Sequence, residues 1–137
     1  MIEIKGEQGE IISLELIGSL YQDAEDEADA NFLKASIKAI VPGFIGNFTF
    51  VTSKNEMAYL LSNLEDFDLF KVLKLHFKTV EENFIINMFT NELGIVLWQL
   101  ELKYPNENGA SLNIHMENDI TYVQKIITEL REDLLSL

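Results

Sequence analysis

The sequence contains no cysteine, so it forms neither a disulfide framework nor a thiolate metal site, and it has no cysteine nucleophile. Basic residues are also scarce: ten lysines and arginines stand against 23 aspartates and glutamates, for a formal charge of −13. Such an excess repels phosphate backbones and anionic membranes at moderate salt. We therefore expect neither nucleic acid nor membrane as a partner; the charge favours a basic protein partner or simply keeps the chain in solution.

Long hydrophobic runs are missing too, and the longest apolar stretches are only a few residues long. A membrane-spanning helix needs about 20 consecutive apolar residues, so none is expected. The first residues, Met1 to Lys5, lack the basic start and apolar segment of a secretory signal. We therefore expect a cytoplasmic protein, and 137 residues with 47% hydrophobic content match a single domain over residues 1–137.

Residues for familiar enzyme chemistry are few. The two histidines, His76 and His115, fall on different predicted strands among polar neighbours, which indicates solvent-facing positions rather than a metal site. The sequence has no Gly-x-Ser-x-Gly elbow for a nucleophile and no glycine-rich phosphate loop. Among 23 acidic residues a pair of carboxylates arises readily by chance, so a carboxylate-only enzyme is the weakest alternative. We expect no catalysis, no cofactor and no metal.

Alternating apolar and polar residues recur along the chain and predict β-strands. The predicted strands cover residues 2–5, 11–17, 31–39, 44–51, 71–79, 83–90, 93–104 and 110–117. Short turns separate them, among them Pro42-Gly43, where proline presets φ and glycine tolerates a positive φ. Gly46, inside the fourth strand, suggests a bulge or a close approach. The strand at 93–104 is apolar enough on both faces for the centre of a sheet.

Two helices are predicted between and after the strands. Ser53 and Glu56 have capping-box spacing before a helix that we expect to end within residues 65–68. Asp119 is the expected N-cap of a second helix that runs to the end of the chain. The chain thus shows four strands and a helix, twice. We predict the α+β class, with a largely antiparallel β-sheet of about eight strands and two α-helices, one mid-chain and one C-terminal.

The densest charge lies between the second and third predicted strands. Five carboxylates occur within seven residues: Asp23, Glu25, Asp26, Glu27 and Asp29. They resemble the start of an EF-hand loop, but Ala28 takes the place of the glycine and Lys34 that of the final glutamate, so no specific calcium site is expected. We interpret the five as candidate contacts to a basic partner. The alternative is a solvated connection that contacts nothing.

Several stretches of the chain resemble the WapI family of bacterial immunity proteins. They are residues 2–7 (Ile-Glu-Ile-Lys-Gly-Glu), residues 23–33, the turn at 41–46 and the acidic helix after it. Phe32 stands where a tryptophan is usual in the family and keeps the aromatic character. The resemblance implies a small cytoplasmic antitoxin that binds the toxic C-terminal domain of a wall-associated, contact-dependent toxin, with no catalysis of its own.

Toxin domains of such systems commonly cleave RNA, so the resemblance also implies an acidic protein that covers a basic RNA-binding cleft. We predict an immunity protein that neutralises its toxin by steric and electrostatic blockade. The alternative from another class is an acidic adaptor or regulatory module unrelated to toxins. The identity of the toxin and the oligomeric state stay open.

Overall fold

The computed structural model describes residues 1–21 and 31–137 and shows two antiparallel sheets of four strands each. The first sheet contains, in sequence order, β1 (Ile2–Lys5), β2 (Ile11–Ser19), β3 (Phe32–Val41) and β4 (Phe44–Ser53). The second contains β5 (Lys74–Lys78), β6 (Phe84–Thr90), β7 (Ile95–Lys103) and β8 (Ser111–Asp119). Helix α2 (Lys54–Asp68) connects the sheets, and α3 (Thr121–Leu135) follows β8. The predicted α+β class, with its eight strands and two helices, is confirmed.

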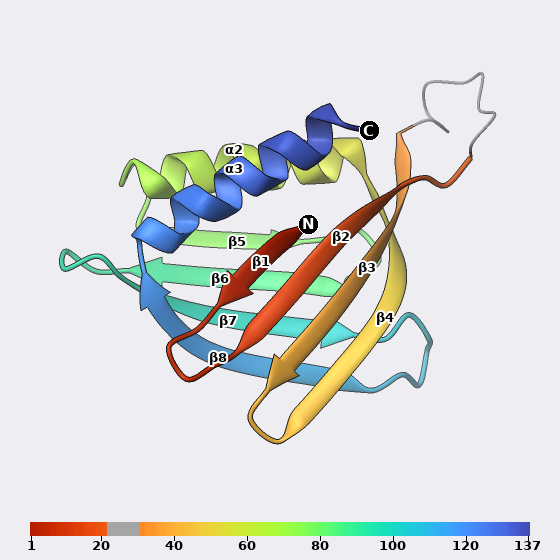
Figure 1. Ribbon diagram of the computed structural model, residues 1–137, viewed down its shortest axis with the longest axis horizontal. Helices are drawn as coiled ribbons and strands as arrows, with labels where there is room; N and C mark the ends of the chain where they lie inside the picture. The colour runs from red at the N-terminus through yellow and green to blue at the C-terminus, as the bar shows by residue number, and fades with distance from the viewer. Residues whose placement is uncertain (22–30) are drawn as a thin grey trace.

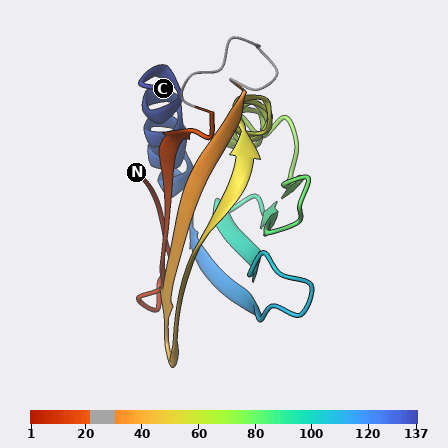
Figure 2. The ribbon, with the colours of Figure 1, turned by 90° about the vertical axis from the view of Figure 1, so that its right-hand side faces the viewer.

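The two sheets lie face to face, and the strands of the first run obliquely across those of the second (Figure 1). Helices α2 and α3 pack against each other at one end of the sheets. Figure 2 shows both helices at that same end, and the tip of the β3–β4 hairpin at the opposite end. The helices therefore cover one end of the two sheets, and the end with the hairpin tip has no helix.

The core lies between the sheets and under the helices. Because side chains alternate across a strand, every second residue points inward, as Ile12 and Leu14 do on β2 and Trp98 and Leu100 on β7, all at most 2% exposed. Inward residues of both sheets and both helices form one hydrophobic cluster. As predicted, β7 lies inside its sheet, between β6 and β8.

Helix α2 begins with half of the predicted capping box. The Ser53 hydroxyl accepts the N–H of Glu56 at 3.0 Å. The reciprocal half is wrong, because the Glu56 carboxylate instead accepts the Thr52 hydroxyl and the N–H of Val80, both at 2.6 Å. That carboxylate ties the start of α2 to the turn after β5, and sequence spacing alone does not reveal this distant partner. The helix ends at Asp68, as predicted.

Two expectations about the strands are wrong. Gly46 forms neither a bulge nor a close contact, because β3 and β4 pair without interruption and the space beside Gly46 is open. The irregularity in the first sheet lies in β2, between Leu16 and Gly18. The fifth strand begins at Lys74 instead of residue 71, since the chain must first leave α2 through Phe70, whose φ is 56°.

Asp119 is the last residue of β8, and Ile120 occupies the N-cap position of α3 without a side-chain capping bond. Asp119 therefore does not hold the position that the sequence predicts. It still serves the helix, because its carboxylate accepts the N–H of Thr121 at 2.9 Å.

Candidate partner-binding surface

The five predicted contact residues, Asp23, Glu25, Asp26, Glu27 and Asp29, lie outside the described part of the chain. Their role stays a prediction. The rest of the chain is acidic without them: five of the 23 acidic residues fall in that segment, which leaves 18 against ten basic residues. Acidic surfaces therefore also occur among the described residues.

One such surface forms where the β1–β2 turn meets the edge of β8. The Glu7 N–H donates to the Glu117 carbonyl at 3.0 Å, so the turn hydrogen-bonds to the second sheet. Within the turn, Glu10 accepts the Gln8 N–H at 2.8 Å through its side chain. A Cβ on Gly6 would lie 2.8 Å from the same carboxylate oxygen of Glu10, so the glycine leaves room for this carboxylate.

A buried polar network holds the two sheets together below this turn. The indole N–H of Trp98 donates to Asn118 Oδ1 at 2.7 Å, and Asn118 Nδ2 donates to the Lys5 carbonyl at 2.9 Å. Trp98 and Asn118 are each 1% exposed. Because a buried polar group without a partner is costly, these bonds specify how β1 sits against β7 and β8. They thereby position the turn that carries Glu7 and Glu10.

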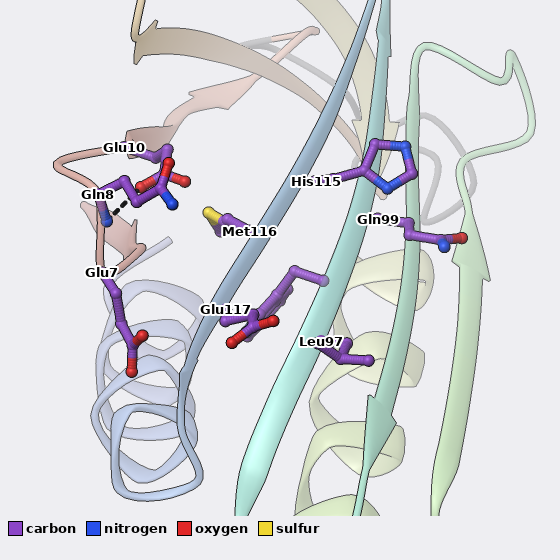
Figure 3. A pocket seen from close by; sticks show the side chains of 9 residues that line it. Glu7, Gln8, Glu10, Leu97, Gln99, His115, Met116 and Glu117 are labelled. Carbon is purple, nitrogen blue, oxygen red and sulfur yellow. Dashed lines mark hydrogen bonds between the residues drawn. The ribbon is translucent and has the colours of Figure 1, made fainter.

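Turn and sheet together enclose a pocket of about 380 Å³. Nine residues line it: Glu7, Gln8 and Glu10 from the turn, Leu97, Trp98 and Gln99 from β7, and His115, Met116 and Glu117 from β8. Figure 3 shows the turn residues on one side of β8 and Gln99 and His115 on the other, so the pocket spans the strand's edge. We call it the acidic pocket.

Among the described residues that line it, the acidic pocket has three carboxylates and no lysine or arginine. Glu10 is only 6% exposed, and none of the three is in an ion pair within the described residues. The three carboxylates of the acidic pocket favour the binding of an ammonium or guanidinium group from another protein. Leu97 and Met116 offer apolar surface for the alkyl stem of a lysine or arginine. The pocket is thus suited to cationic side chains of another protein.

The histidines lie on the outer face of the second sheet, as predicted. His76, Asn87, Gln99 and His115 are paired in register across β5 to β8 and form one polar row. His76 Nδ1 lies 2.6 Å from Asn87 Oδ1, and His115 reaches the acidic pocket. No group of three or more potential metal ligands is found in residues 1–21 and 31–137.

Among the described residues, two exposed carboxyls have a lowered pKa, each for a local reason. A hydrogen bond and ion pair with Lys78, at 3.0 Å, lower the pKa of Glu82 in the turn after β5. Hydrogen bonds with Thr121 lower the pKa of Asp119 at the start of α3. Both shifts come from turn and helix-start contacts outside the acidic pocket.

The sequence analysis missed the acidic pocket because its carboxylates are far apart in the chain. Glu7 and Glu10 are separated from Glu117 by more than a hundred residues, and only the packing of the first sheet on the second unites them. The available signal was weak: a glutamate-containing turn, and a glutamate at an outward position near the end of a predicted strand.

Comparison with solved structures finds a similar fold in a protein of very different sequence. The structure of the plant transcriptional regulator PBF-2 superposes with a TM-score of 0.54 and 9% identity, covering 96% of this chain and 78% of that one. Trypanosoma bruciei MRP1/MRP2 gives a TM-score of 0.48 and 12% identity, covering 93% and 74%. At such identities the likeness concerns the fold alone.

Comparison with curated proteins finds no match. Among the described helices, none combines the length and apolarity that crossing a bilayer requires. The sequence does match a family of immunity proteins over residues 2–137, which spans both sheets and both helices. That match confirms the resemblance, which spans nearly the whole chain in the order of its elements and has its distinctive residues mainly in the first fifty. The chain belongs to the WapI-like immunity protein family.

Proposed function

We propose that this protein neutralises the C-terminal toxin domain of a cognate, contact-dependent, wall-associated toxin by binding it directly. The observation that carries the proposal is the match to the immunity protein family over residues 2–137. The charge of −13 supports a basic partner. We place the action in the cytoplasm and treat residues 1–137 as one domain.

Neutralisation requires only that the toxin's working surface be covered. An RNA-cleaving domain binds a polyanion and therefore presents basic side chains. An acidic protein seated on those side chains excludes RNA both by its bulk and by its charge. In this proposal Glu7, Glu10 and Glu117 receive lysine or arginine side chains in the acidic pocket, and the carboxylates at 23–29 increase the association rate.

The first experiment is calorimetric titration of this protein into the purified toxin domain encoded beside it, with RNA cleavage followed in parallel. We expect one-to-one binding and inhibition that reaches completion at equimolar protein, because blockade is stoichiometric. No binding, or cleavage that continues in the saturated complex, would contradict the proposal and favour the acidic adaptor.

A pair of double variants tests the acidic pocket within that complex. Glu7→Gln with Glu117→Gln removes two pocket charges and should weaken binding by about tenfold or more, as for charge pairs at an interface. Glu15→Gln with Glu132→Gln removes the same charge from exposed positions elsewhere and should change affinity by less than about threefold. Equal effects of the two pairs would mean that only net charge matters.

A further inference from the structure

Sheet edges need protection, because their free N–H and C=O groups can pair with another strand. In the described part of the chain, three of the four edge strands are protected. β1 has only four residues and packs against α3. β5 has five residues and places Lys74 and Lys78 on its outer face. β8 places Glu117 and Asp119 outward and accepts a hydrogen bond from the β1–β2 turn.

β4 has none of these protections. It is ten residues long, Phe-Ile-Gly-Asn-Phe-Thr-Phe-Val-Thr-Ser, with no charged residue and no proline. Its pairing with β3 runs without a bulge from Phe44 to Ser53. Within residues 1–21 and 31–137 no strand pairs with its other side. Such a bare edge stands out in a chain in which 24% of residues are charged.

A groove runs along this free edge, between β4 and the turn that joins β7 to β8. One half, about 530 Å³, is lined by residues 44–48 of β4 together with Leu102, Tyr104 and residues 110–112, none of them charged. The other half, about 690 Å³, is lined by residues 49–51 and 103–107, and also by Leu20, Lys34, Glu81 and Asn83. Tyr104 lines both halves, so the groove follows β4 along most of its length.

Large apolar side chains stand exposed where the groove begins. Phe44 is 65% exposed and Ile45 is 72% exposed. The half-exposed ring of Tyr104 packs edge-on against Phe48, with 6.0 Å between the two ring centroids. Aromatic side chains next to a pocket are the usual anchors of protein interfaces. Strand addition requires free backbone N–H and C=O groups and, beside them, space for every second side chain of the added strand. The edge of β4 and the groove next to it provide both.

We propose that the free edge of β4 binds an extended segment of the toxin domain, which joins the first sheet as an additional strand. Alternate side chains of that segment enter the groove beside Phe44, Phe48 and Tyr104. This inference rests on the proposed function, because the toxin domain is its occupant. In the complex, the acidic pocket attracts the toxin domain, and the edge of β4 fixes the register in which its segment binds.

Charge favours the toxin domain over a second copy of this chain. Two copies would each bring a charge of −13 to the contact, whereas a basic domain is attracted. Within the groove itself charges balance, since Lys34 and Lys103 stand with Glu81 and Glu107 in the wider half. The bound segment should therefore carry mainly apolar or neutral side chains, on a domain that is basic elsewhere.

The sharpest test removes one outward N–H from β4. The two-residue turn closes on the pair Val41 and Phe44, so by alternation the N–H of Asn47 points away from β3. Asn47→Pro removes that donor at an edge position where proline is tolerated, and Asn47→Ala keeps it. We expect Asn47→Pro to weaken toxin binding by about tenfold or more and Asn47→Ala by less than about threefold.

A second pair of variants covers the case in which Asn47→Pro fails to fold, which circular dichroism would reveal. Phe44→Ala should weaken binding by about tenfold, whereas Tyr59→Ala, an aromatic of 63% exposure on α2, should have little effect. In hydrogen exchange, the amides of Ile45, Asn47 and Thr49 should gain protection when the toxin domain is added.

The outcomes separate the two proposals. If the wild-type chain binds the toxin domain, and Asn47→Pro and Phe44→Ala bind it as tightly as the wild type, the strand inference alone is overturned. A wild-type chain that does not bind would overturn the proposed function and this inference with it. A wild-type dimer by light scattering that Asn47→Pro dissociates would assign the edge to a second copy, against our proposal.

Discussion

Asn118 illustrates how a single side chain can set the relation between the two sheets. It lies at an inward position of β8, and its amide bonds to both Trp98 of β7 and the carbonyl of Lys5 in β1. Asparagine suits the position because its side chain both accepts and donates, and both capacities are used there. An apolar residue of similar size would fill the space and leave two buried polar groups without partners.

Asn118→Ala should therefore lower the free energy of unfolding by about 3 kcal/mol, since each abandoned polar group accounts for roughly 1–3 kcal/mol. Urea denaturation followed by the fluorescence of Trp98, the only tryptophan, measures the change. Asn113→Ala, on the exposed face of the same strand, is the control and should stay within about 0.5 kcal/mol of the wild type. A similar stability for both variants would show that water replaces the Asn118 bonds.

Phe70 gives a second prediction for a single residue. The chain leaves α2 with the Phe70 N–H bonded to the Phe67 carbonyl and the Lys71 N–H bonded to the Asp66 carbonyl, a Schellman arrangement. Phe70 takes the left-handed position, with φ of 56°, where glycine is usual. Phe70→Gly should therefore be about 1 kcal/mol more stable than Phe70→Ala.

Both Phe70 variants lack the aromatic ring, so their difference in thermal denaturation isolates the backbone effect. If the alanine variant were equally stable, the turn would have changed its conformation to relieve the strain. A structure of Phe70→Ala would then show a changed φ at residue 70.

At the scale of an element, the start of α3 depends on a residue that belongs to β8. Asp119 accepts the Thr121 N–H, one of the amides that a helix leaves without an internal partner. This bond favours the charged carboxylate and holds the pKa of Asp119 below its ordinary value of 3.8. A depressed pKa in the folded state means stability that is present above the unfolded pKa and lost as pH falls through the folded one.

We expect Asp119→Ala to be less stable than the wild type at pH 6, with a difference that shrinks below pH about 4 as the wild-type carboxylate is protonated. Urea denaturation at several pH values measures this difference. Asp119→Asn keeps an acceptor that does not titrate, so its stability advantage over Asp119→Ala should persist in acid. A deficit of Asp119→Ala that is independent of pH would point to packing as its cause.

Elements that a local pattern specifies were predicted well from the sequence. The β1–β2 hairpin, the third strand, predicted at 31–39, and the start of α2 lie within two residues of where alternation, turn residues and the capping serine place them. The failures, at Gly46, at the start of β5 and at Asp119, each depend on something outside the local pattern. A glycine permits a bulge without requiring one, and the path out of α2 depends on how that helix packs.

At the scale of the whole molecule, charge and shape act separately. The segment with five carboxylates and the acidic pocket attach to opposite ends of β2, since the segment follows Ser19 and the pocket's turn precedes Ile11. In the proposed function, the charges of residues 23–29 and of the acidic pocket both attract the basic toxin domain. The groove along β4 then selects one docked arrangement.

Replacing Asp23, Glu25, Asp26, Glu27 and Asp29 by asparagine or glutamine should leave the melting temperature nearly unchanged, because exposed like charges contribute little or repel. The association rate with the toxin domain should fall, and it should depend less on salt than in the wild type. Stopped-flow measurements at low and moderate ionic strength provide the test. An unfolded variant would instead mean that the segment is structural.

The sequence by itself determined the order of strands and helices, the inward faces and the acidic character, because each of these depends on neighbours within a few residues or on composition. It also carried the family resemblance, which the match over residues 2–137 confirmed. Only the tertiary structure decided that the first hairpin meets β8, that Asn118 joins the sheets, and that β4 is a bare edge beside a groove. Those features depend on contacts between residues far apart in the chain, which local periodicity does not encode.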